Sequence, residues 1–214
     1  MKKILLLLMV SILLTSCSIT IPVQADLNND TMLLAKTKNI KANYTLLSDV
    51  SDGYLNYVAI QKNGTKRYQS KFAKYRSETA FRKIWSSYFS NKFSNYSKDE
   101  MNVKVKMKKL RLKQQTITSS ASTLFSGNLK YTLTAVTKVY FEISYHGETY
   151  RKEFDVESSG YNENQKVKGA YNYTGSVNAT NPTQQKAELL EDCFNKSIIR
   201  FENYVTFILM KDKE

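Results

Sequence analysis

The sequence has 214 residues, 42% of them hydrophobic and 12% aromatic, and it carries a formal net charge of +13. That length and apolar content fit one folded domain and exclude an intrinsically disordered chain. The charge suits anionic lipid headgroups, an acidic polysaccharide or nucleic acid, and it equally suits a solvated basic surface without a partner.

The most specific motif lies in residues 1–17. Two lysines precede an apolar run from Ile4 to Leu14, which is shorter than the roughly 20 residues that span a bilayer. The run ends in Leu-Thr-Ser-Cys17. This is the pattern of a secretory signal peptide, and its end resembles the bacterial lipobox. The resemblance implies removal of residues 1–16 and a lipid on Cys17; the alternative is an ordinary signal peptide in which Cys17 is incidental.

The same resemblance implies a location and a chain organisation. Ser18 follows the cysteine, and by the family rule a residue other than Asp there favours the outer membrane facing the periplasm; the alternative is the cell surface. A secreted chain is not expected to bind nucleic acid. We expect residues 17–37 to be the lipidated cysteine and a tether, and residues 38–214 to be one domain.

The first elements after the tether are a hairpin and a helix. Strand-like runs from Tyr54 to Gln61 and from Lys66 to Phe72 flank Asn-Gly, the strongest short hairpin signal. Apolar residues at three- and four-residue steps then predict a helix from an N-cap at Ser77 to Phe93, with one face on a sheet.

The next strand alternates apolar and basic residues and then changes phase. Val103, Val105 and Met107 alternate with lysines, whereas Leu110 and Leu112 are out of phase, which predicts a β-bulge near Lys108-Lys109. Its basic residues are a candidate surface for an anionic lipid headgroup or glycan: Lys104, Lys106, Lys108, Lys109, Arg111 and Lys113. A solvated edge strand, whose lysines discourage pairing with other sheets, would explain the same pattern.

A long hairpin, a loop and a helix complete the chain. Apolar side chains at odd positions predict a strand over residues 129–145, which turns at His146-Gly147 into a second strand over residues 148–156. Residues 158–181 are rich in Gly, Asn, Ser and Tyr, which predicts a mobile loop able to contact a glycan or a protein. Pro182 begins a helix with a buried stripe, beside which Cys193 is expected as a buried thiol.

The sequence contains few residues suited to catalysis. His146 is the single histidine, and motifs for a nucleophile, a metal or a phosphate-binding loop are absent. Paired carboxylates can hydrolyse glycosides without histidine, but Glu148, Glu153 and Asp155 are expected on a solvent-facing strand surface. If Cys17 is lipidated, Cys193 has no disulfide partner. We therefore expect a protein that is not an enzyme and uses no cofactor or metal.

The order of elements together with the lipobox resembles small bacterial envelope lipoproteins of the YajG type. It is similar, more distantly, to the lipoprotein auxiliaries of lipid-transporting ABC systems. The resemblance covers residues 38–210 and implies an α+β fold, an antiparallel sheet with two amphipathic helices packed on one face. It implies no catalytic residue.

We therefore expect a membrane-anchored envelope lipoprotein with a non-enzymatic binding or scaffolding role in envelope assembly or maintenance, with an anionic lipid, a glycan and an envelope protein as candidate partners. One alternative is an accessory lipoprotein of a lipid-transport system, which predicts an apolar cavity between sheet and helices. The other is a surface-exposed adhesin or host-interacting lipoprotein that uses the loop at residues 158–181.

Overall fold

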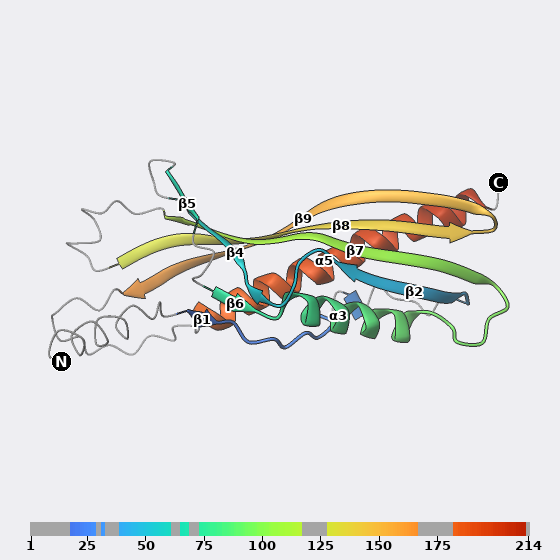
Figure 1. The fold of residues 1–214 in the computed structure, drawn as a ribbon, viewed down its shortest axis with the longest axis horizontal. Helices are drawn as coiled ribbons and strands as arrows, with labels where there is room; N and C mark the ends of the chain where they lie inside the picture. Colours follow the sequence, from blue (N-terminus) through green and yellow to red (C-terminus); the bar gives the residue numbers. More distant parts are fainter. Residues whose placement is uncertain are drawn as a thin grey trace, which may run out of the picture.

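A computed structural model describes residues 18–28, 31–32, 39–60, 65–68, 73–116, 128–166 and 182–212. Its elements form an elongated body in which a long twisted sheet lies against two helices (Figure 1). In chain order they are β1 (Ile19–Thr20), β2 (Lys41–Ser48), β3 (Gly53–Tyr54), β4 (Asn56–Ile60), β5 (Lys66–Tyr68), β6 (Ala73–Tyr75), α3 (Ser77–Lys92), β7 (Glu100–Thr116), β8 (Asn128–Tyr145), β9 (Glu148–Lys166) and α5 (Pro182–Lys211).

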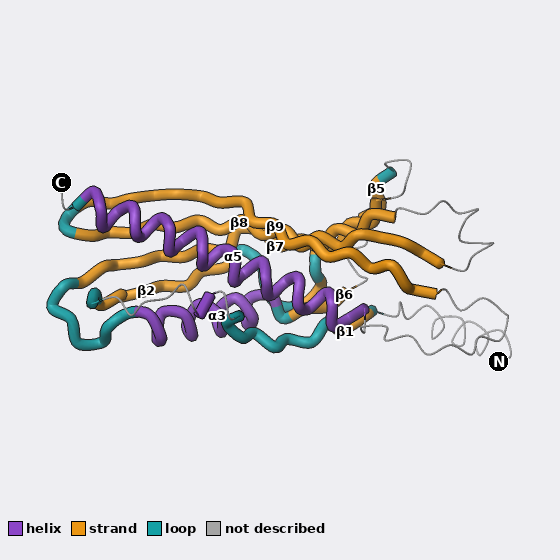
Figure 2. The backbone as a smooth tube through the Cα atoms, turned by 180° about the vertical axis from the view of Figure 1, so that it is seen from behind, coloured by secondary structure: helices purple, strands orange, loops and turns teal. Residues whose placement is uncertain are grey.

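The main sheet has the order β5-β4-β7-β8-β9, and β2 also pairs with β7. The pairs β4–β5, β7–β8 and β8–β9 are antiparallel. Both β2 and β4 run parallel to β7, one after the other along the same edge of that strand. The expected α+β class and mainly antiparallel sheet are therefore confirmed, whereas the two parallel pairings were not predicted. Figure 2 shows α5 crossing the sheet obliquely with α3 beside it.

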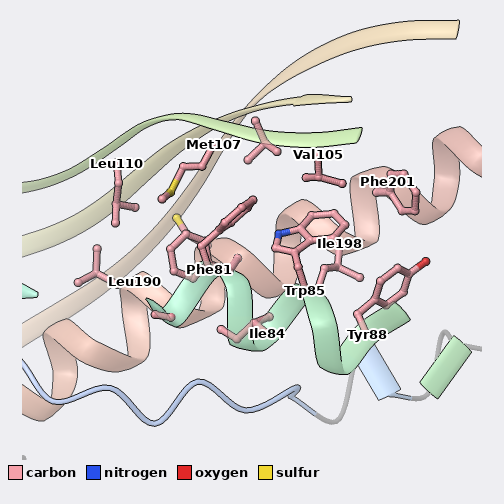
Figure 3. Close-up of a cluster of buried hydrophobic side chains, with 14 of the residues drawn as sticks. Phe81, Ile84, Trp85, Tyr88, Val105, Met107, Leu110, Leu190, Ile198 and Phe201 are labelled. Carbon is pink, nitrogen blue, oxygen red and sulfur yellow. The ribbon is translucent and has the colours of Figure 1, made fainter. Parts of the chain in front are cut away.

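Aromatic side chains fill the space between the helices and the sheet (Figure 3). Trp85 on α3 is fully buried, and its ring centroid lies 5.5 Å from that of Phe201 on α5 and 5.7 Å from that of Phe141 on β8. Such tilted and edge-to-face pairs stabilise a core beyond the burial of their area. The apolar stripes predicted for both helices are therefore the core face. The stripe of α5 consists of Ala187, Leu190, Phe194, Ile198, Phe201, Val205 and Ile208, all fully buried.

The long hairpin turns where the sequence predicted. His146 has a φ of 47° and Gly147 a φ of 83°, and a two-residue type I′ turn requires positive φ at both positions. The second strand is longer than expected, because β9 pairs with β8 as far as Lys166. Residues 158–166 are therefore strand rather than the start of the predicted loop at 158–181, and residues 167–181 lie outside the described part of the chain.

The small residues in this part of β9 have a packing role. A Cβ atom on Gly160 would lie 3.3 Å from Cδ2 of Leu189, tighter than most Cβ contacts, so α5 approaches the strand where a larger side chain would obstruct it. Ser158 is buried beside the same helix and donates a hydrogen bond to Asp192. The small residues of this stretch, which are typical of loops, here allow α5 to pack closely against β9.

The start of α3 differs from the expectation in one detail. Arg76, not Ser77, occupies the N-cap position and makes no capping hydrogen bond with its side chain. Ser77 is the first helical residue and is buried. The capping role is taken by Asp52, whose carboxylate accepts a hydrogen bond from the backbone N–H of Thr79 at 3.0 Å and another from its hydroxyl group.

Residues 18–28, the N-terminal strap, pack against the domain. Ile21 is 2% exposed and Ala25 1% exposed, and strand β1 pairs in parallel with β6. The expected tether over residues 17–37 is therefore wrong for this stretch, since alternate apolar side chains bury against the helices. Cys17 and residues 29–30 and 33–38 lie outside the described residues.

Hydrogen bonds hold the strap to the last helix. The backbone N–H of Gln24 donates to Oε1 of Glu191 at 2.7 Å, and that of Asn28 donates to Oδ1 of Asn195 at 3.1 Å. The side chain of Asn195 also donates to the carbonyl of Asp26 at 3.2 Å. The strap thus joins the two ends of the described chain.

Candidate functional site

The candidate site is the open face, the surface of the main sheet opposite the helices, where the row of basic residues predicted on β7 lies. Val103, Val105 and Met107 point toward the helices and are buried, and so are Leu110 and Leu112. The pairing with β8 changes register between Met107 and Lys109, which confirms the predicted bulge. The extra residue shifts the alternation of side chains along β7 by one position. The basic side chains before and after the bulge therefore lie on the same face of the sheet, the open face.

Most of this row is neutralised by carboxylates of neighbouring segments. The four ion pairs are Lys104–Glu142 (3.4 Å), Lys106–Asp49 (2.8 Å), Lys113–Glu157 (3.5 Å) and Lys108–Glu153. Three of these carboxylates come from β8 and β9, so the pairs run across strands. Cross-strand pairs of opposite charge stabilise a sheet modestly, and exposed ones contribute little energy. Their main effect is to give the open face interleaved charges of both signs.

Glu142 is the most strongly bound carboxylate of this face. It accepts hydrogen bonds from Nε of Arg151 and from the hydroxyl of Tyr140, each at 2.9 Å, and it lies near Lys104. The hydrogen bond from Arg151, with that from Tyr140, lowers the pKa of Glu142 to about 2. The group is therefore ionised throughout the physiological range and is unsuited to donate a proton.

Two basic residues of the row are different. Lys109 and Arg111 form no ion pair with any described residue, and Nε of Arg111 is buried without a hydrogen-bond partner in the described structure. The interpretation of β7 as an edge strand is wrong, because β8 pairs along one side of it and β2 and β4 along the other. The positive charge of the row that is available to an anion therefore belongs to Lys109 and Arg111, next to the bulge.

A shallow hollow of about 540 Å³ lies at the β2 side of the face. The side chains that give it its polar character are Asn43, Thr45, Asn102, Lys104, Glu142 and Ser144. The ion pair between Lys104 and Glu142 belongs to its wall, so the hollow offers a fixed donor and a fixed acceptor side by side. It suits polar groups of a partner surface better than an apolar ligand.

Cys193 is the buried thiol that the sequence predicted. Its side chain is fully buried, and its S–H donates to the carbonyl of Ala135 at 3.1 Å. Burial raises the pKa of the Cys193 thiol to about 12. A nucleophilic cysteine requires a lowered pKa, so this thiol is structural.

A cluster that sequence reasoning missed lies at the β8–β9 turn. His146 contacts Asp99 and Asp212, and the hydroxyl of Tyr145 donates to Asp99 at 2.7 Å. These residues come from three separate segments, so no local pattern could have grouped them. Within the described residues no group of three or more His, Cys, Asp or Glu side chains is placed to hold a metal ion. None of the described helices is long and apolar enough to cross a membrane.

Comparison with known proteins adds only a general likeness. No family model and no curated protein matches the sequence. An uncharacterised protein of known structure superposes with a TM-score of 0.41 at 9% identity, covering 88% of this chain and 99% of its own. A Xanthomonas campestris protein of family DUF330 superposes with a TM-score of 0.42 at 7% identity, covering 91% of this chain and 97% of its own. Similarity at this level carries no argument about function.

Proposed function

We propose that the protein is a bacterial envelope lipoprotein, anchored through Cys17, whose domain binds another envelope protein through the open face without catalysing a reaction. The lipobox-like motif that ends at Cys17 supports the envelope location. The interleaved ion pairs of the open face support the binding role, because a surface with fixed charges of both signs is suited to a complementary protein surface.

The charge pattern favours a protein over a polyanion. A polyanionic glycan lying across the face would meet the carboxylates of Glu142, Glu153 and Glu157 as well as the lysines paired with them. Like charges brought together in this way cost free energy, whereas a protein with the opposite pattern gains both attraction and specificity. Lys109 and Arg111 have no paired carboxylate among the described residues, so they could still bind an anionic headgroup or glycan. Such an anion is therefore the alternative ligand.

The state of the carboxylates supports a non-enzymatic role. A catalytic acid requires a raised pKa, as in the glycosidases. The pKa of Glu142 is instead about 2, and hydrogen bonds from Lys108 and Lys138 lower the pKa of Glu153. These groups are held as permanent anions, which serves recognition and not proton transfer.

The two rival roles lack a supporting observation. Lipid transport predicted an apolar cavity between sheet and helices, but aromatic rings fill that space around Trp85. The adhesin role assigned contact to the loop at 158–181, of which residues 158–166 belong to β9 and residues 167–181 are not described.

The anchor is tested by intact mass and membrane fractionation in the native host, comparing wild type with Cys17→Ala. We expect acyl chains and membrane partition for the wild type alone. An unmodified, freely soluble wild type would contradict the proposal.

The binding role is tested in the same cells by a photo-crosslinking amino acid at Lys109, on the open face, with a matched position at Arg200, an exposed residue of α5. We expect a discrete protein adduct from position 109 that is lost on adding Arg111→Glu. Adducts from both positions, or from neither, would contradict it.

The alternative ligand has a separate test. Protein that begins at Ser18 is mixed with anionic phospholipid vesicles, with and without Lys109→Gln and Arg111→Gln. If the headgroup alternative holds, the double variant binds more weakly; unchanged binding removes it.

A further inference from the structure

A second surface lies where the chain leaves the described structure toward Cys17. Strands β1, β6 and β3 form a small three-stranded sheet in which β6 is central. Lys74 on β6 is the register partner of both Thr20 on β1 and Tyr54 on β3. Ala73 and Tyr75 are buried, and strand side chains alternate, so these three partners point outward. We call Thr20, Lys74 and Tyr54 the outer row.

Covalent geometry limits how far Cys17 can lie from this row. Two peptide units separate Cys17 from Ile19, so their Cα atoms lie at most about 7 Å apart. Ile19 is fixed by pairing with Ala73, and the backbone N–H of Ile21 donates to the carbonyl of Lys74 at 2.8 Å. A lipid on Cys17 would therefore enter a bilayer within about two residues of the small sheet.

The outer row has the chemistry of a membrane interface. Tyr54 is 52% exposed, and Nζ of Lys74 lies 5.1 Å from the centre of its ring. Tyrosine is enriched at the level of the headgroups, and a nearby lysine or arginine attracts their phosphates. Arg76 follows two residues later with a side chain that is 72% exposed. Its Nε lies 3.8 Å from Oδ2 of Asp52, an ion pair that compensates part of its charge, and Asp52 also accepts a hydrogen bond from Thr79 at the start of α3.

We propose that the outer row is a membrane contact surface that lies on anionic phospholipid headgroups and fixes how the domain stands on the bilayer. This inference rests on the proposed lipidation of Cys17. The β8–β9 turn and the segment between α3 and β7 lie at one end of the molecule, and the small sheet lies toward the other, where the start of β8 and the end of β9 extend beyond it (Figure 1).

The test uses full-length, lipidated protein, purified from membranes and reconstituted into vesicles of phosphatidylethanolamine and phosphatidylglycerol with brominated acyl chains, which quench nearby tryptophan. One variant carries Tyr54→Trp. The matched control carries Tyr96→Trp in the segment before β7, where Tyr96 is 95% exposed. Trp85 is fully buried and is the only native tryptophan, so both variants share the same background.

We expect the brominated lipid to quench the tryptophan at position 54 several-fold more than the one at position 96. Adding Lys74→Glu should reduce this difference, whereas adding Lys98→Glu, beside the control position, should not. Equal quenching in protein whose mass shows the lipid would overturn the inference and leave the anchor intact. Protein without the lipid would overturn the anchor, and the inference with it.

Discussion

The Nδ1 atom of His146 lies 2.9 Å from Oδ2 of Asp212, and on the other side of the ring Nε2 lies 3.1 Å from Oδ1 of Asp99. The imidazole thus joins the β8–β9 turn to the end of α5 and to the segment before β7. Both ring nitrogens can donate only when the ring is protonated. The hydrogen bond to Asp99, assisted by that to Asp212, accordingly raises the pKa of His146.

This arrangement predicts a pH-dependent contribution to stability. The folded pKa of His146 lies above the unfolded value of about 6.5, so the contribution is complete below about pH 6.5 and is lost as pH rises through the folded pKa. His146→Asn removes the titration and tolerates the positive φ. In urea unfolding, we expect the wild type to exceed the variant in stability at about pH 5.5, and the difference to vanish in alkaline solution. A difference that does not change with pH would contradict the prediction.

The N-terminal strap should contribute to folding stability as core does. Ile21 is 2% exposed, and truncation of a buried isoleucine to alanine costs about 2–5 kcal/mol. We expect Ile21→Ala to lower the free energy of unfolding within that range, measured by urea denaturation. Thr20→Ala changes an exposed neighbour and should cost less than about 0.5 kcal/mol. Equal and negligible effects would mean that the segment is a tether after all.

Thiol titration gives a second test of the lipid. Burial and the raised pKa of Cys193 should make it unreactive toward a maleimide in native protein and reactive after unfolding. The sequence has two cysteines, so unfolded protein whose mass shows that residue 17 is retained should have one reactive thiol if Cys17 is lipidated and two if it is not. Rapid labelling of native protein at Cys193 would contradict the burial.

The bulge in β7 should be indispensable. Deletion of Lys109 shortens β7 by one residue and so removes the bulge, so that either Leu110 and Leu112 turn to solvent or charged residues turn to the core. Loss of two buried leucines costs about 4 kcal/mol or more, a large share of the stability of a typical domain. We expect no folded protein by circular dichroism and thermal melting. Lys109→Gln keeps the chain length and should fold normally; a folded deletion variant would contradict the assignment.

Features determined by local pattern could be predicted from the sequence. The phase change between Met107 and Leu110 marks the bulge, and His146-Gly147 marks the turn, because each depends on residues next to one another. The helices follow in the same way from the spacing of their apolar residues. The basic row was recognised as one face of one strand.

Features that join distant segments could not be predicted in this way. The carboxylates that neutralise the row lie on other strands, and the parallel pairing of β2 and β4 with β7 depends on register between separate segments. The strap did leave a signal, since Ile19, Ile21, Val23, Ala25 and Leu27 alternate with polar residues and Pro22. Proximity to the cleavage motif and the proline concealed a strand-like pattern.

The hydrogen bonds between the strap and α5 also set the order in which the chain can fold. Their partners, Gln24 with Glu191 and Asn28 with Asn195, are each 167 residues apart. Contacts of such separation form only after the intervening chain has been synthesised and closed into a loop. The strap therefore cannot dock until the last helix has been synthesised. If Cys17 is lipidated as proposed, the residues that follow it stay undocked, and so accessible to the processing enzymes, until that point.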